Sequence, residues 1–89
     1  MGQLDPDYVR QCRDRAERGD LDALCNLGRM YSTGHGVSSD LVEAHKWFNI
    51  AAARGSVQAK IYREALAADM TARQVAAALS EARQWVQSH

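Results

Sequence analysis

The amino-acid sequence nearly repeats itself, and this internal repeat constrains the fold more than any other feature. The segment Arg18–Ala23 (RGDLDA) recurs as Arg54–Ala59 (RGSVQA), so the starts at 18 and 54 differ by 36 residues. The segment Glu43–Trp47 (EAHKW) recurs as Glu81–Trp85 (EARQW), so the starts at 43 and 81 differ by 38 residues. A period of this length is typical of helical repeat arrays, in which each unit buries its apolar face only against its neighbours. Such an array offers a binding surface more readily than a reaction centre.

The composition predicts a single all-α domain. The chain has 89 residues, of which 46% are apolar and one is proline. Many of the apolar residues are alanines, which have the highest helix propensity and allow helices to approach closely. A domain of this size buries roughly 60–65% of the surface of its unfolded chain, so we expect a thin margin of stability.

Capping and helix-breaking residues divide the chain into five expected helices. The expected breaks are Gly19, the segment 32–37, Gly55 and the segment 68–71. The expected N-caps are Asp20, Asp40, Ser56 and Thr71, and capping-box patterns occur at Asp40–Glu43 and Thr71–Gln74, after the second and the fourth break. We therefore divide the chain into a half repeat at 6–19, a full repeat at 20–55 and a modified terminal repeat at 56–88.

Two features of the expected helices concern their packing. Gly28 lies inside a strong helical pattern, where glycine costs about 1 kcal/mol relative to alanine, and such a glycine usually marks the close approach of another backbone. In the last helix, apolar residues follow one another at spacings of four, three and four, as on one helical face. These residues are Val75, Leu79, Ala82 and Val86.

Charge and termini argue against two classes of partner. The chain has 11 basic and 11 acidic residues and a formal net charge of zero, whereas nucleic-acid binding usually requires a basic stripe. The segment Met1–Asp5 lacks the basic and apolar regions of a secretory signal, and no stretch approaches the ~20 apolar residues of a membrane span. We therefore expect a cytoplasmic protein that binds neither nucleic acid nor membrane.

The residues capable of chemistry form no recognisable catalytic or metal pattern. The cysteines and histidines show no zinc-ligand spacing such as C-x2-C or H-x3-H, so we expect no metal and no cofactor. Cys25 or Ser32 could be paired with His35, but no strand-turn-helix elbow accompanies them, so we expect no enzyme. Cys12 and Cys25 are expected to be free thiols, with a disulfide left open. Among the histidines, His45 is expected at the boundary of an apolar face and His89 at a frayed end.

The central part of the chain resembles the Sel1-like repeat. The matching pattern is Ala23-x3-Leu27-Gly28-x2-Tyr31-x2-Gly34-x-Gly36-Val37-x2-Asp40-x3-Ala44-x2-Trp47-x3-Ala51-Ala52-x2-Gly55-x3-Ala59. The resemblance implies antiparallel helix pairs stacked into a right-handed α-solenoid, akin to tetratricopeptide repeats. It also implies an adaptor in protein complexes, without catalysis of its own.

The flanking helices depart from this pattern. The first helix has Gln11 and Cys12 where the repeat has Trp47 and Phe48. In the fourth helix, the positions of Leu27, Gly28 and Tyr31 are taken by Arg63, Glu64 and Ala67. Polar residues at packing positions suit the ends of an array, which need wettable outer faces. Any binding groove is therefore expected to be short.

We expect the partner to bind on the first helix of each pair, the A helix, because the A helices of helical solenoids line the concave surface. The candidate partner-binding residues are Asp22, Asn26 and Arg29 in one A helix and Lys60 and Arg63 in the next. The expected function is non-enzymatic protein–protein interaction with a peptide or helix. The alternative is a structural unit that self-associates, as a homodimer or larger homo-oligomer, to complete a solenoid.

Overall fold

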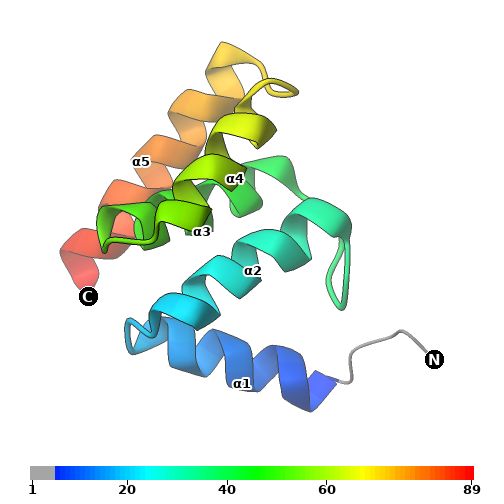
Figure 1. Cartoon of the computed structure of the whole chain (residues 1–89), viewed down its shortest axis with the longest axis vertical. Coiled ribbons are helices and arrows are strands. Elements are labelled where there is room, and N and C mark those ends of the chain that lie inside the picture. Colours follow the sequence, from blue (N-terminus) through cyan, green and yellow to red (C-terminus); the bar gives the residue numbers. More distant parts are fainter. Residues whose placement is uncertain (1–5) are drawn as a thin grey trace.

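Helices account for all the regular structure in the described part of the chain, residues 6–89 (Figure 1). The computed structural model contains α1 (Pro6–Glu17), α2 (Leu21–Thr33), α3 (Leu41–Ala53), α4 (Val57–Ala67) and α5 (Ala72–Ser88). The expectation of an all-α helical repeat fold is confirmed. The segment Met1–Asp5, on which the expectation of no secretory signal rests, lies outside the described residues.

The helices begin at the residues whose side chains can cap them. Asp20, Ser56 and Thr71 accept hydrogen bonds from backbone N–H groups three residues further on. Thr71 and Gln74 form the expected reciprocal capping box. At the start of α3 only half of the expected box is present. Asp40 accepts from the backbone N–H of Glu43, but the Glu43 carboxylate accepts from Trp47 Nε1 at 3.1 Å.

The hairpin of α2 and α3 is the most closely packed part of the molecule. Gly28 lies directly against Phe48, because a Cβ built on Gly28 would be only 2.5 Å from Cδ1 and Cε1 of that ring. The turn between the two helices begins at Gly34, whose φ of 74° is in the left-handed region that glycine adopts without strain. The expected close approach at Gly28 is therefore present.

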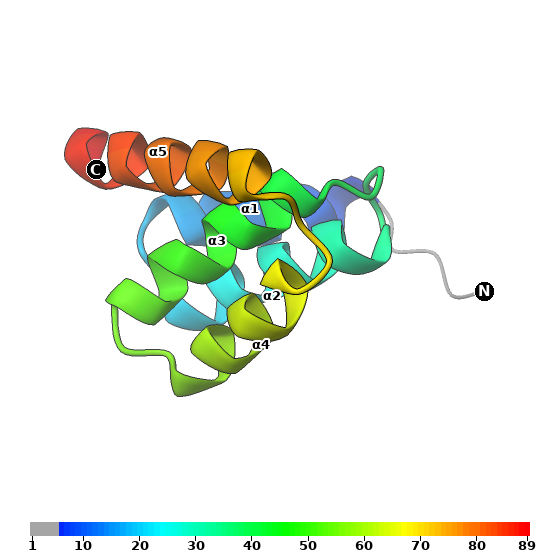
Figure 2. The ribbon, with the colours of Figure 1, turned by 90° about the horizontal axis from the view of Figure 1, so that it is seen from above.

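α3 is the central helix, with neighbours on several sides. α1 packs on α2, while α4 and α5 both pack on α3 and make at most marginal contact with each other. Figure 2 shows α5 and α4 on opposite sides of α3. The core includes Leu24 and Leu27 of α2 and Trp47 and Phe48 of α3. Trp85 of α5 meets Trp47 edge to face, with ring centroids 5.8 Å apart, and this aromatic pair joins α5 to the core.

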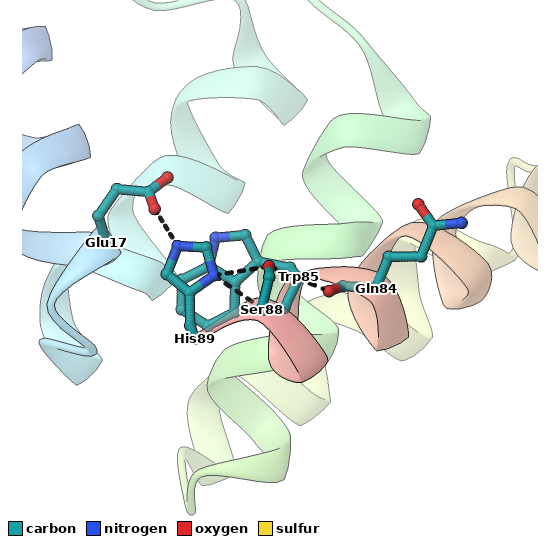
Figure 3. A network of polar contacts seen from close by, with 5 residues as sticks. All are labelled: Glu17, Gln84, Trp85, Ser88 and His89. Atoms are coloured by element: carbon teal, nitrogen blue, oxygen red, sulfur yellow. Dashed lines mark hydrogen bonds and ion pairs between the residues drawn. The ribbon is translucent and has the colours of Figure 1, made fainter.

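The end of α5 is attached to α1 rather than frayed, which corrects the expectation for His89 (Figure 3). The His89 ring stacks on Trp85 with centroids 3.9 Å apart, and its Nδ1 lies 2.8 Å from the Trp85 carbonyl oxygen. Its Nε2 contacts the carboxylate of Glu17 at the end of α1. Ser88 Oγ donates to backbone carbonyls of the preceding turn, including that of Gln84. The carboxyl-terminal end of α5 therefore lies beside the carboxyl-terminal end of α1.

Candidate functional site

A groove of about 450 Å³ lies between α1 and the carboxyl-terminal half of α2. Met30 forms part of its lining and is buried, whereas the ring of Tyr8 is 44% exposed. The residues among 6–89 that line it are Tyr8, Asn26, Arg29, Met30, Thr33 and His35. A smaller cleft of about 120 Å³ continues towards the start of α2 and includes Asp22 and Asn26. The groove thus combines apolar or aromatic surface with polar side chains at its rim.

A second groove, of about 570 Å³, lies between α4 and α5 and has the end of α3 as its floor. Its lining includes Leu79 and Val86 of α5, which are 44% and 47% exposed. The described residues that line it are Asn49, Ile50, Ala52, Ala53, Lys60, Arg63, Leu79, Ala82, Arg83 and Val86. The groove exists because α4 and α5 separate around α3 instead of packing on each other.

The five candidate residues are divided between these two grooves. Asn26 and Arg29 line the α1–α2 groove, with Asp22 in the cleft beside it. Lys60 and Arg63 line the α4–α5 groove. The α2 surface reaches α4 through Arg29, whose Cζ lies 5.7 Å from the centroid of the Tyr62 ring. Tyr62 therefore lies between the two sets of candidate residues.

A chain of polar contacts runs beneath the α4–α5 groove. Arg63 donates from Nη1 to Asn49 Oδ1 at 3.1 Å, and Asn49 Nδ2 lies 2.7 Å from His45 Nδ1. Because the Asn49 oxygen accepts from Arg63, its amide nitrogen donates to His45, whose Nδ1 is then the unprotonated nitrogen. Burial lowers the pKa of His45, and the nearby positive charge of Arg63 lowers it further. His45 is only 3% exposed, so the expectation of a boundary histidine is wrong.

Comparison with known families identifies the hairpin of α2 and α3. Residues 21–56 match the family described as Sel1 repeat. This segment is similar to a Sel1 repeat. No curated protein matches the chain in sequence. Sel1 repeats mediate protein–protein interaction and are not themselves enzymes.

The segment beyond the Sel1 repeat contains groove residues that the sequence reasoning missed. Leu79 and Val86 were expected on the buried face of α5, but that face consists of Ala78, Ala82 and Trp85. The helix is therefore rotated about its axis by less than one residue from the expected orientation, because Ala82 lies on both faces while Ala78 and Trp85 take the places of Leu79 and Val86. A signal for this was present in α4, where Arg63 and Glu64 stand in place of the Leu27 and Gly28 of the Sel1 repeat. Charged residues there give α5 no apolar surface on α4.

The two cysteines, which are the nucleophilic side chains considered above, lie in the hydrophobic core. Cys12 and Cys25 are free and buried, and burial raises the pKa of both thiols, which keeps them in the unreactive protonated form. In residues 6–89, no three His, Cys, Asp or Glu side chains are grouped as metal ligands. None of the helices described is long and apolar enough to cross a membrane.

Proposed function

We propose that this chain is a non-catalytic protein-interaction module that binds a partner peptide or helix on the A-helix face of α2. The observation that carries this proposal is the α1–α2 groove, in which Tyr8 and Met30 supply apolar contact area beside Asn26 and Arg29. Aromatic and arginine side chains are the residue types that dominate binding energy at protein interfaces. The similarity of residues 21–56 to the Sel1 repeat family supports the same function.

The proposed mechanism is burial of a partner segment in the groove, with polar side chains fixing its register. Arg29 is exposed but lies over the Tyr62 ring, which restricts its side chain before binding. A restricted side chain loses less entropy on binding, so it suits a charged hydrogen bond to a partner carboxylate. Lys60 and Arg63 belong to this proposal as a second contact region on α4.

The test is affinity capture from a lysate of the source organism with identification by mass spectrometry. The wild type is compared with Asn26→Ala/Arg29→Glu, and Arg73→Glu serves as a control at an exposed arginine of α5. A protein retained by the wild type and the control, and lost with the folded double variant, supports the α2 face. Equal capture by all three proteins rejects that face.

A second candidate function is self-association, because the outer face of α4 is apolar. Val57 and Ile61 are one turn apart and are 72% and 61% exposed. Stacking of a second copy on this end would bury both side chains and extend the array. Sedimentation and the melting temperature, each measured over a range of protein concentrations, test this candidate. A monomer at all concentrations with a constant melting temperature rejects it.

A further inference from the structure

The α4–α5 groove exposes apolar side chains that a regular repeat would bury. In the Sel1 repeat, Phe48 of the second helix covers Gly28 of the first. At the corresponding positions of the terminal pair, Val86 is 47% exposed and Glu64 is exposed. Leu79, about two helical turns before Val86 on α5, is also exposed at the groove wall. The groove therefore has an apolar wall with no partner from α4.

The rim of this groove is positively charged. Lys60 and Arg63 lie one turn apart on α4, and Arg83 lies on α5. Within the described part of the chain, no carboxylate lines the groove. Among residues 6–89, none of these three cations is within ion-pair distance of an Asp or Glu side chain. Although the formal net charge of the whole chain is zero, Lys60, Arg63 and Arg83 give this groove a positively charged rim, which favours a negatively charged ligand.

One of the cations is held in place. Arg63 donates to Asn49, which in turn contacts the buried His45, so the guanidinium is fixed at the floor of the groove. An arginine has five N–H donors, and this hydrogen bond uses one of them. The remaining donors can bind a carboxylate without the full entropic cost of ordering a free side chain.

The walls of the groove favour a helical ligand over an extended one. They are the helices α4 and α5, whose backbone groups are hydrogen-bonded within each helix, so they offer no sheet edge to an extended peptide. A ligand helix satisfies its own backbone and places an apolar stripe into the groove. The cations on both walls would then meet carboxylates on both sides of that stripe.

Charge also argues against a second copy of this chain as the occupant. The five helices carry mixed charges, and the acidic residues of α1 are interleaved with Arg10, Arg13 and Arg15. α4 and α5, which expose Val57, Ile61, Leu79 and Val86, contain Lys60, Arg63, Arg73 and Arg83 against Glu64 and Glu81. A second copy that docked through these helices would therefore bring further positive charge to the groove.

We propose that the α4–α5 groove binds an acidic amphipathic helix of another protein, with Leu79 and Val86 contacting its apolar stripe and Lys60, Arg63 and Arg83 its flanking carboxylates. This rests on the premise of the proposed function that the ligand is a protein segment, and it shares Lys60 and Arg63 with the second contact region named there. Leu79, Val86 and Arg83, the groove itself and the charge of the ligand are separate from those of the α2 face.

The test uses a fluorescein-labelled synthetic helix as the probe. The peptide is about 18 residues long, since shorter isolated helices are marginal, and has leucines at helical spacing flanked by glutamates. A matched peptide has lysine at every glutamate position. Binding is measured by fluorescence anisotropy at about 50 and about 300 mM salt, because screening weakens contacts between exposed charges.

The variants separate the groove from the rest of the surface. Lys60→Glu/Arg83→Glu reverses two rim cations whose side chains form no hydrogen bond or ion pair within residues 6–89, and Arg63 is left intact because it contacts Asn49. Arg18→Glu/Arg73→Glu makes the same change in net charge at exposed positions outside the groove. Circular dichroism confirms that each variant is folded.

We expect the glutamate peptide to bind, the lysine peptide not to bind, and the affinity to fall with salt. Lys60→Glu/Arg83→Glu should weaken the glutamate peptide at least tenfold, while Arg18→Glu/Arg73→Glu changes it less than threefold. No binding, equal binding of both peptides, or equal loss in both double variants overturns the proposal. Asn26→Ala/Arg29→Glu should leave probe binding unchanged, so failure at one surface is distinguished from failure at the other.

Discussion

The α2–α3 pair and the α4–α5 pair are built from corresponding sequence positions, yet only the first closes into a tight hairpin. In the first pair, Gly28 allows the ring of Phe48 to lie on the backbone of α2. In the second pair, the same two positions are Glu64 and Val86, both of which are exposed. Trp47 and Trp85, by contrast, are buried in both pairs and touch each other.

This difference shows that two separate contacts hold a helix in the array. The tryptophan at the second helix of each pair attaches that helix to the neighbouring core, and this contact is retained in α5. The small residue of the first helix closes the pair, and this contact is absent where Arg63 and Glu64 stand in place of Leu27 and Gly28. The terminal pair is therefore attached to α3 but open, and the opening forms the α4–α5 groove.

The largest expected effect tests the contact that both pairs share. Trp47→Ala should lower the free energy of unfolding by about 3–5 kcal/mol, because removing a large buried aromatic leaves a cavity. Trp47 is 2% exposed, and its loss also removes the edge-to-face contact with Trp85. Chemical denaturation measures the change. A loss below about 1 kcal/mol would refute the role of Trp47 in attaching α5.

The next effect tests the contact that differs between the pairs. Gly28→Ala should destabilise the protein by about 1–2 kcal/mol, because overpacking against Phe48 outweighs the gain in helix propensity. Glu64→Ala at the corresponding exposed position should change stability by no more than about 0.5 kcal/mol. Thermal and urea unfolding of both variants check the contrast. A more stable Gly28→Ala protein would show that the first pair is not closely packed.

A third prediction concerns the buried polar chain that links the two pairs. The pKa of His45 is lowered from its ordinary value of 6.5, so below about pH 6.5 the unfolded chain binds a proton that the folded chain does not. Stability should therefore fall as the pH decreases from 7 to 5, by up to about 1.4 kcal/mol per pH unit for one proton.

His45→Gln is the matched variant for this pH dependence. It removes the titrating ring but keeps an acceptor for Asn49, so its stability should decrease less between pH 7 and 5 than that of the wild type. Urea unfolding at several pH values measures the two slopes. Identical slopes in both proteins would mean that His45 does not take up its proton on unfolding.

Arg63→Gln should raise the pKa of His45 in an NMR titration, because a neighbouring positive charge is removed.

The smallest expected effect concerns the open groove. Val86→Ala should change stability by no more than about 0.5 kcal/mol, because the side chain is half exposed and alanine has the higher helix propensity. Phe48→Ala, at the corresponding position of the closed pair, should cost about 3–5 kcal/mol. A cost above about 2 kcal/mol for Val86→Ala would show that the terminal pair closes in solution.

The sequence by itself determined the five helices, their ends and the close approach at Gly28. Caps such as Ser56 and Thr71 act on N–H groups three residues away, and Gly34 acts on its own backbone dihedrals. These interactions are local, so a sequence pattern is sufficient to predict them. The pattern of residues 21–56 likewise predicted the Sel1 repeat, because a regular repeat unit has a regular packing partner.

Only the tertiary structure decided how the terminal pair opens and which candidate residues share a groove. A partial rotation of α5 about its axis buries Ala78 and exposes Leu79, and helical spacing alone does not distinguish these faces. The position of Lys60 and Arg63 opposite Arg83 depends on that rotation and on the separation of α4 from α5. Both depend on how α4 and α5 pack on α3, and α5 is distant from α3 in sequence. A helix turns towards the neighbour against which it buries more apolar surface, and this neighbour is known only from the tertiary structure.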